Sequence, residues 1–318
     1  MLPQADLSRP QRIAVIVNPH ARLMRRSAAL APALRAEAEG RASVHTTENL
    51  DQLEAVCRDL CAAETELAVI AGGDGSLMAG VTALARAYGP DALPSVAPIG
   101  GGTVATISRN WGVDPAPVPT LRRLLRRPRR RQWRPSLEVT AEGEPSRIGF
   151  IVGTGLVASF FDEYYRRGAP GYRGAARMVA RIFAESFIGG PLARAVLEPM
   201  PCRLETDGMP SCPEAWSLIC AAAVPNLGIG MRVTYRAEED PERLHLVASP
   251  LRPRQLGPRA PLVLAGRSIG GRGHVDRLVS RFAIRFPATG RYVLDGELLE
   301  ASRLQVRPGP PILVTTPT

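Results

Sequence analysis

The chain has 318 residues with 40 basic and 30 acidic side chains, a formal net charge of +10, and all 40 basic residues are arginine. The lack of lysine excludes enzymes that form a Schiff base through a lysine amine, and nucleotide-binding proteins whose phosphate loop ends in Gly-Lys. A hydrophobic content of 45% is sufficient for a sizeable core, and the length predicts about two domains.

The numbers and spacing of cysteine and histidine exclude further classes of protein. Five cysteines without a Cys-x-x-Cys pair support neither a disulfide framework nor a zinc site, and the four histidines are scattered. No apolar stretch reaches the length of a membrane-spanning helix, and the first residues lack an apolar signal core. We therefore expect a reduced, soluble, cytoplasmic protein.

The first third of the sequence predicts alternating strands and helices. An apolar, β-branched run such as IAVIV at 13–17 is typical of a strand buried on both faces. Strands separated by helices predict right-handed crossovers and a parallel sheet. In chain order we expect a strand at 13–17, a helix at 27–39, a strand at 43–47, a helix at 50–63, a strand at 67–71, a helix at 76–88 and a strand at 95–99.

After about residue 135 the pattern changes to short Val-, Ile- and Leu-rich runs separated by turn residues, which is typical of an antiparallel sandwich or barrel. We expect an α/β fold with an N-terminal parallel-sheet domain (1–134) and a C-terminal antiparallel β-sandwich domain (135–306) with a helical insertion (159–188). The segment 307–318 is a candidate to return to the first domain. The expected strands lie at 137–140, 148–152, 217–224, 244–248, 282–286, 292–294, 304–306 and 312–315.

The domain boundary is expected in the segment 121–134, which contains eight arginines and no acid. A solvated helix end and linker is one interpretation, since charge runs are often that. A patch for anionic lipid head groups is another. Nucleic-acid binding is a weaker third, because aromatic residues are few and no nucleic-acid-binding signature is present, so we expect no nucleic-acid partner.

Three polar or glycine-rich segments follow predicted strands, at the sheet edge where open α/β folds bind ligands. Glycines allow the backbone to approach a phosphate, so that N–H groups and a helix N-terminus face it, although a plain structural turn is the alternative for each. Asp74 beside a phosphate requires a bridging Mg²⁺ or a sugar hydroxyl. The segments are Asn18-Pro19-His20, Gly72-Gly73-Asp74-Gly75-Ser76 and Gly100-Gly101-Gly102-Thr103.

The order of these motifs, together with Asn226-Leu227-Gly228-Ile229-Gly230-Met231 and Asp295-Gly296-Glu297 in the β-rich half, resembles the diacylglycerol kinase catalytic-domain family. That family includes bacterial diacylglycerol and sphingosine-type lipid kinases. The resemblance runs from about residue 13 to 314 and implies an ATP- and Mg²⁺-dependent lipid kinase. It also implies a lipid substrate and reversible, peripheral association with an anionic membrane surface.

The resemblance implies a role for each matching residue. Those expected to hold ATP are Asn18, Pro19, Arg25, Gly72, Gly73, Asp74, Gly75, Ser76, Gly102 and Thr103. Asp295 would accept the proton of the lipid hydroxyl, and Glu297 would support it, with Asp74 and Glu297 as candidate metal ligands. From the residues alone, Asp295-Gly296 between apolar runs also predicts a tight hairpin turn.

The sequence departs from the family at four positions. The family has acidic residues at the positions of Ala79 and Thr106, and a different residue at the position of Ala105. Arg25 replaces the expected lysine. Two alternatives therefore stay open: a degenerate member that binds nucleotide or lipid without turnover, and an NAD kinase, which shares the GGDG[TS] loop. The identity of the lipid and the oligomeric state are not readable from the sequence.

Overall fold

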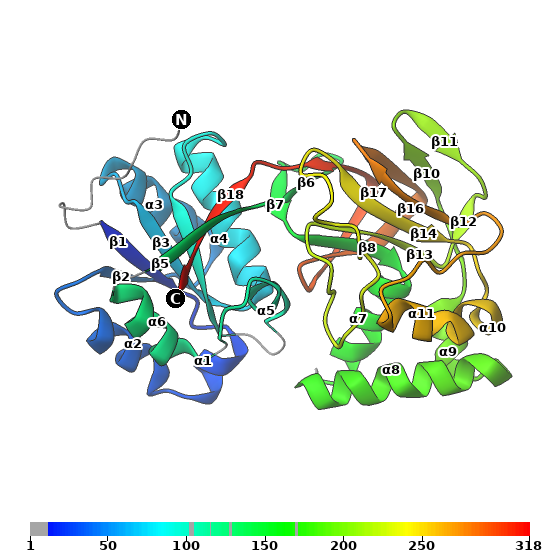
Figure 1. Ribbon diagram of the computed structural model, residues 1–318, viewed down its shortest axis with the longest axis horizontal. Coiled ribbons are helices and arrows are strands. Elements are labelled where there is room, and N and C mark those ends of the chain that lie inside the picture. The colour runs from blue at the N-terminus through cyan, green and yellow to red at the C-terminus, as the bar shows by residue number, and fades with distance from the viewer. Residues whose placement is uncertain (1–11, 102–104, 115, 127–128, 169–170) are drawn as a thin grey trace. The chain divides into compact units, whose positions relative to one another are not determined.

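Three fully buried strands of small and β-branched residues form the centre of a six-stranded sheet, sheet A, with the order β2-β1-β3-β4-β18-β5 (Figure 1). The pairs β1–β2, β1–β3, β3–β4 and β4–β18 are parallel, and burial on both faces explains the unbroken apolar runs. The strands are β1 (Ile13–Val17), β2 (Ser43–Thr46), β3 (Leu67–Gly72), β4 (Ser95–Gly100), β5 (Arg129–Arg134) and β18 (Ile312–Pro317).

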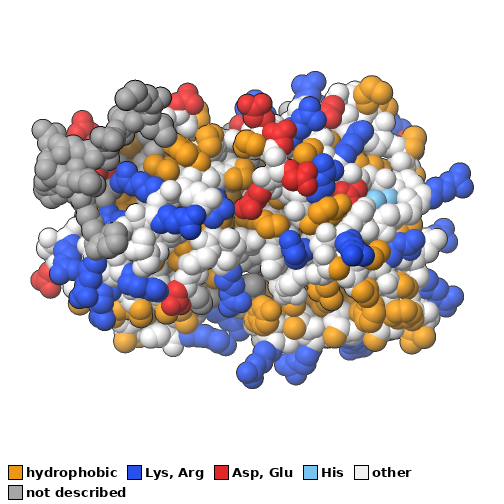
Figure 2. Space-filling view, in the orientation of Figure 1, with side chains coloured by type: hydrophobic (Ala, Val, Ile, Leu, Met, Phe, Trp, Pro, Cys, Tyr) orange, Lys and Arg blue, Asp and Glu red, His pale blue; other side chains and the backbone are white. Residues whose placement is uncertain are grey.

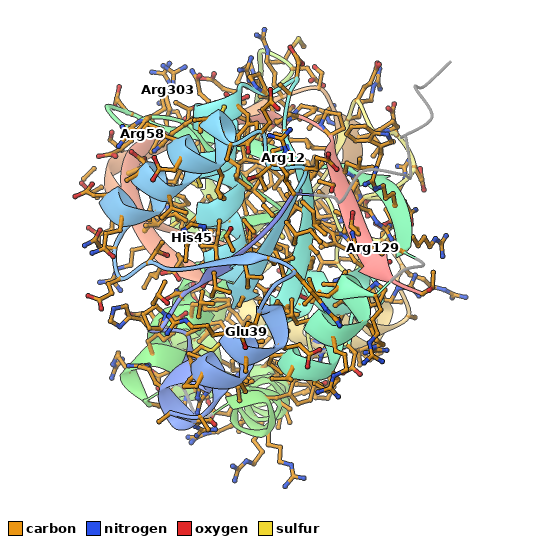
Figure 3. All side chains as sticks on the ribbon, turned by 90° about the vertical axis from the view of Figure 1, so that its left-hand side faces the viewer. Arg12, Glu39, His45, Arg58, Arg129 and Arg303 are labelled. Carbon is orange, nitrogen blue, oxygen red and sulfur yellow. The ribbon has the colours of Figure 1, made fainter. Side chains whose placement is uncertain are left out.

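Helices cover both faces of sheet A (Figure 3, where Arg12 precedes β1 and Arg129 begins β5). Apolar residues of α1, α2 and α6 share one core with β1, β3 and β4. On the other face α3 packs against α4, and α4 approaches Ile70 so closely that a methyl group on Gly80 would lie 2.7 Å from its Cδ1. The helices are α1 (Arg22–Arg26), α2 (Leu30–Ala38), α3 (Leu50–Ala62), α4 (Asp74–Tyr88) and α6 (Pro117–Leu125).

This computed structural model describes residues 12–101, 105–114, 116–126, 129–168 and 171–318. Tertiary contacts divide the chain into two units, of which the first comprises residues 1–102, 112–133 and 312–318. The second comprises residues 103–111 and 134–311. The last strand, β18, therefore belongs to the sheet of the N-terminal unit, inserted between β4 and β5.

The second unit is built on a ten-stranded sheet, sheet B, whose paired strands are all antiparallel. Its main path runs β15-β14-β13-β8-β16-β17-β6-β7, and β10 and β11 branch from β16. The strands are β6 (Leu137–Ala141), β7 (Arg147–Gly149), β8 (Ile151–Gly155), β10 (Arg203–Thr206), β11 (Met209–Ser211), β13 (Leu218–Ala222), β14 (Leu244–Ser249), β15 (Val275–Val279), β16 (Phe282–Leu294) and β17 (Glu297–Pro308). Separately, β9 (Met200–Pro201) pairs with β12 (Ala215–Trp216).

A group of helices packs against β13 and β14 of sheet B. Leu218, Cys220 and Val247 from these strands lie in one apolar core with residues of five helices. These helices are α7 (Leu156–Arg166), α8 (Gly171–Ile188), α9 (Pro191–Leu197), α10 (Pro253–Leu256) and α11 (Ala260–Leu264). The short helix α5 (Thr106–Asn110) also belongs to this unit.

The predicted fold class is confirmed: a parallel-sheet α/β part and a separate antiparallel β part. Apart from the β9–β12 pair, the strands of the β-rich part form one continuous hydrogen-bonded sheet. The predicted strands 282–286 and 292–294 are one strand, β16, with a register shift between Arg285 and Gly290. The predicted helix 27–39 is wrong at its start, because Pro32 is tolerated only in a first turn, so α2 begins at Leu30.

The described residues of the segment 121–134 form a helix end, as one interpretation expected, and an edge strand in place of the expected linker. The segment contains the end of α6, whose Leu121 and Leu124 are buried, and the strand β5 at the edge of sheet A. The sequence could not show this because β5 pairs with β18, a strand nearly 180 residues later. Arginines are distributed over the visible surface of both units (Figure 2).

Candidate active site

In the first unit, the loop after β1 is tied to the first turn of α4. Asn18 follows β1, and its backbone N–H donates to the carbonyl of Ala71 at 3.1 Å. Its side-chain Nδ2 donates to Oγ of Ser76 at 2.8 Å, while its Oδ1 accepts from the backbone N–H of His20 at 2.8 Å. Both functional groups of Asn18 are therefore used to fix the geometry of this loop.

The two glycine-rich loops contact each other at the carboxyl edge of sheet A. The N–H of Gly101 donates to the carbonyl of Gly72 at 2.7 Å. A methyl group on Gly101 would lie 2.9 Å from Cα of Gly72, and one on Gly72 would lie 2.3 Å from Cβ of Ser76. The close approach of the Gly72 backbone thus explains Gly101, and the close approach of the Ser76 side chain explains Gly72. Gly102 and Thr103 lie outside the described residues.

The loop after β3 leads directly into α4, a helix of 15 residues. Gly73 is its N-cap and provides no side-chain hydrogen bond, so the first N–H groups of the helix lack a side-chain cap there. Asp74, Gly75 and Ser76 form the half-buried first turn. The partial positive charge of a helix N-terminus favours a phosphate, and it also stabilises the carboxylate of Asp74.

A pocket of about 220 Å³ opens beside Asn18 and Ser76. Its walls combine apolar side chains of β1, β3 and α3 with polar side chains at the carboxyl ends of the strands. The lining residues are Ile16, Asn18, His20, Thr47, Glu48, Asn49, Leu50, Leu53, Ile70, Ser76 and Ala79. Pro19 and Arg25 are close in sequence to Asn18 but are not among the residues that line the pocket. Arg25 is exposed in the last turn of α1.

Sequence reasoning missed the residues that follow β2. Thr47, Glu48 and Asn49 line the pocket, and Asn49 also caps α3 by accepting the N–H of Gln52 at 2.9 Å. Polar residues directly after β2 occupy the same sheet edge as Asn18, which is the signal that could have identified them. Ala79, where the family has an acid, also faces this pocket.

In the second unit, Asp295 and Gly296 form the two-residue turn between β16 and β17. Both have positive φ, +48° and +88°, and Leu294 pairs with Glu297 across the turn. The Asp295 carboxylate is buried and accepts the N–H of Phe150 at 2.9 Å and that of Ile151 at 2.8 Å. The hairpin expected from Asp-Gly is therefore present, and the carboxylate is fixed against β8.

Helix α7 packs over this turn. The hydroxyl of Tyr165 donates to the carbonyl of Gly296, and a methyl group on Gly296 would contact the ring of Phe161 at 3.8 Å. Burial of the hydroxyl, followed by the negative charge of Glu297, raises the pKa of Tyr165 to about 12. Glu297 itself is exposed. Two aromatic side chains of α7 thus contact the turn that carries the predicted base.

A second turn provides a structural comparison. Asp207 has φ +52° and is followed by Gly208 in the turn between β10 and β11. Its Oδ1 accepts the N–H of Ser280 at 2.9 Å and that of Arg281 at 3.2 Å. Because Asp207 repeats the backbone and the amide contacts of Asp295, those features by themselves indicate turn stabilisation. A catalytic role for Asp295 must rest on other grounds.

The loop 226–231 is held by α5 within the second unit. Asn110 Nδ2 donates to the carbonyl of Asn226 at 2.7 Å, and its Oδ1 accepts the N–H of Asn226 at 3.2 Å. Thr106, in place of the family's acid, is buried in the first turn of α5. Ala105 precedes it in a left-handed conformation, φ +50°, that favours glycine or asparagine.

Comparisons with known proteins find a similarity to diacylglycerol kinases. The diacylglycerol kinase catalytic domain matches residues 12–132. The whole fold resembles a solved diacylglycerol kinase from Bacillus anthracis str. Sterne (15% identity, TM-score 0.61) and a candidate diacylglycerol kinase from the same organism (16% identity, TM-score 0.66), each alignment covering 96% of both chains. A search of curated proteins gives no match. Residues 12–132 thus match the diacylglycerol kinase catalytic domain, and the fold of the chain is similar to that of the two solved structures.

Proposed function

We propose that the chain is an ATP-dependent lipid kinase that phosphorylates a hydroxyl of a membrane-derived, diacylglycerol- or sphingosine-like lipid. The observation that carries this proposal is the pocket beside Asn18 and Ser76, which lies at the carboxyl edge of a parallel sheet within the segment that matches the kinase family. Fold similarity to diacylglycerol kinases supports the same class.

The pocket suits the nucleoside end of ATP. Ile16, Ile70 and Leu53 offer apolar surfaces for a planar base, while Thr47 and Asn49 offer hydrogen-bonding groups for the base or the ribose. The phosphates would then follow the glycine loop toward the N-terminus of α4, where N–H groups and the helix dipole favour negative charge.

The residues present fit a magnesium ion only if ATP supplies most of its ligands. No group of three His, Cys, Asp or Glu side chains suited to a metal occurs among the described residues. Mg²⁺ in phosphotransferases is commonly held by one or two carboxylates plus substrate phosphates. Asp74, in the first turn of α4, would be the protein ligand from this unit, and the ion would neutralise phosphate charge when bound.

For the transfer step we propose Asp295 as the base. The lipid hydroxyl oxygen bonds to the γ-phosphorus of ATP, the bond to the β–γ bridging oxygen breaks, and ADP leaves. The hydroxyl proton passes to the Asp295 carboxylate. This proposal rests on the resemblance of Asp295-Gly296-Glu297 to the kinase family's motif, and the amides of Phe150 and Ile151 fix the orientation of the carboxylate as they would in any such turn.

Access to the lipid implies contact with a membrane. No helix in the described part of the chain is both long and apolar enough to cross a bilayer. We propose peripheral, reversible binding to an anionic surface, for which the exposed Arg130 and Arg131 of β5 are one candidate contact. Two arginines of the neighbouring α6 are paired with acids, Arg122 with Glu37 and Arg123 with Asp114, and contribute less free charge.

The test is to incubate the purified protein with γ-labelled ATP, Mg²⁺ and a total lipid extract. We expect label in one organic-phase product, and no labelled lipid in any class would contradict the proposal. ATP binding by calorimetry without product would instead favour a degenerate member, for which the neutral Ala79 in the pocket and the buried Thr106 are the structural motivation. Labelled NADP⁺ formed from NAD⁺ would favour an NAD kinase.

A further inference from the structure

A second pocket, of about 180 Å³, lies within the second unit between α5, the beginning of α8 and the loop 226–230. Its volume is below the roughly 300 Å³ at which drug-sized ligands are accommodated, so it suits a head-group fragment and not a whole lipid. The side chains that line it are Thr106, Arg109, Asn110, Tyr172, Asn226 and Ile229.

Arg109 is the charged side chain of this pocket. Its guanidinium lies over the ring of Tyr172, 5.6 Å from the centroid. Within the described part of the chain no carboxylate forms an ion pair with it. A guanidinium stacked on a ring keeps its N–H edge available, and that edge matches the oxygens of a phosphate or a carboxylate.

The rest of the pocket is neutral and held in place. Asn110 is fixed by its two hydrogen bonds to the backbone of Asn226, and Asn226 Oδ1 accepts the N–H of Gly228 at 3.0 Å. The loop therefore presents a preorganised wall. Thr106 is uncharged where the family has an acid. With no carboxylate among its described lining residues, the pocket repels a cationic head group and attracts an anionic one.

We propose that this pocket recognises an anionic group, a phosphate diester or a carboxylate, on a lipid that also carries the hydroxyl to be phosphorylated. Assignment of this lipid as the acceptor rests on the proposed kinase function. Binding of the anionic group to Arg109 does not, and it can be measured without ATP.

The experiment is calorimetric titration of the full chain, at fixed ionic strength and without nucleotide, with dihexanoylphosphatidylglycerol below its micelle concentration. Dihexanoylglycerol and inorganic phosphate are titrated in parallel. We expect the anionic lipid to bind at least about tenfold more tightly than dihexanoylglycerol, since charge-assisted hydrogen bonds contribute that much. It should also bind more tightly than inorganic phosphate, which carries the charge but lacks the glycerol and acyl groups. Arg109→Gln should remove the preference, and Arg109→Lys should keep part of it.

Arg173→Gln is the matched control, because Arg173 is an exposed arginine of α8 that does not line the pocket. It should leave the preference unchanged. Equal binding of the neutral and anionic lipids, or an unaltered preference in Arg109→Gln, would overturn the proposal. Inorganic phosphate binding as tightly as the anionic lipid would also overturn it, by assigning the pocket to free phosphate. A retained preference without phosphoryl transfer would contradict only the kinase function.

Discussion

The side-chain amide of Asn18 donates a hydrogen bond to Oγ of Ser76 at 2.8 Å, although the two residues are 58 positions apart. This contact joins the loop after β1 to the helix after β3 in the proposed ATP pocket. Asn18 uses its other side-chain atom to accept the N–H of His20. One residue thus couples the two polar segments that the sequence placed at the same sheet edge.

Ser76→Ala removes this coupling. We expect ATP affinity to fall about five- to tenfold, because one hydrogen bond of roughly 1 kcal/mol is lost in the pocket. Titration calorimetry with ATP measures the change. Ser43→Ala is the control, because Ser43 is an exposed residue at the beginning of β2, outside the pocket lining. Equal ATP affinity in both variants would contradict the assignment of the pocket.

Gly101→Ala tests the contact between the glycine loops. The added methyl would lie 2.9 Å from Cα of Gly72, and since backbone cannot rotate away, we expect a loss of stability of about 1–3 kcal/mol together with weaker ATP binding. Urea unfolding and ATP titration measure the two effects.

Gly89→Ala is the comparison for this variant, because Gly89 has φ +83° and open space around it. It should be destabilised by conformational strain alone and should bind ATP normally. Unchanged ATP affinity in Gly101→Ala would show that the loop contact is not connected to the site.

Ala105→Gly should stabilise the protein. Ala105 has a left-handed backbone, φ +50°, which costs an L residue about 1–2 kcal/mol, and glycine relieves it at a smaller cost in chain entropy. We expect a net gain of roughly 0.5–1 kcal/mol in urea unfolding. Ala63→Gly, at an ordinary φ of −81°, should give no gain. A loss of stability in Ala105→Gly would contradict the strained backbone.

Asp276 provides a pH-dependent contribution to stability in the second unit. Its Oδ1 lies 2.7 Å from Nε2 of the buried His245, and its Oδ2 lies 3.6 Å from Nε2 of His274. Burial alone would raise the pKa of Asp276, but the hydrogen bonds from the two histidines outweigh it and hold that pKa well below its usual range. The folded state therefore favours the ionised carboxylate.

A lowered pKa in the folded state gives stability that is present above the unfolded pKa, about 3.9, and is lost as the pH falls through the lower folded value. We expect Asp276→Asn to be less stable than the wild type by about 1–3 kcal/mol at neutral pH. The difference should persist at pH 5 and shrink at more acidic pH. Urea unfolding across this range measures it, and a difference already absent at pH 5 would contradict the assignment.

The sequence predicted the first unit well because its strands are buried on both faces. Runs such as 13–17 and 67–72 consist of small and apolar residues throughout. Short runs of this kind that alternate with helical segments predict buried parallel strands. The edge strand β5 was not predictable, since an arginine-rich segment with no buried face has the composition of a linker. Its role depends on pairing with β18, which is a tertiary property.

For the site, the sequence placed Asn18 and Ser76 at one sheet edge, but it could not show that they bond to each other. It also could not separate the two readings of Asp295. The turn geometry satisfies the hairpin expectation, and Asp207 shows that the same amide contacts occur in a second Asp-Gly turn. The pocket residues Thr47 and Glu48 were missed because no glycine or charge pattern marks them.

The most direct test compares Asp295→Asn with Asp207→Asn in the transfer of labelled phosphate from ATP to extracted lipid. Both variants alter an aspartate of positive φ that accepts two backbone N–H groups, and since Asp295 is buried and Asp207 is exposed, urea unfolding of each variant must show that it is folded under the assay conditions. If Asp295 is the base, its variant loses at least about 100-fold in rate while the Asp207 variant keeps wild-type activity. Equal activity of the two folded variants, or no labelled lipid with the wild-type protein, would contradict the account.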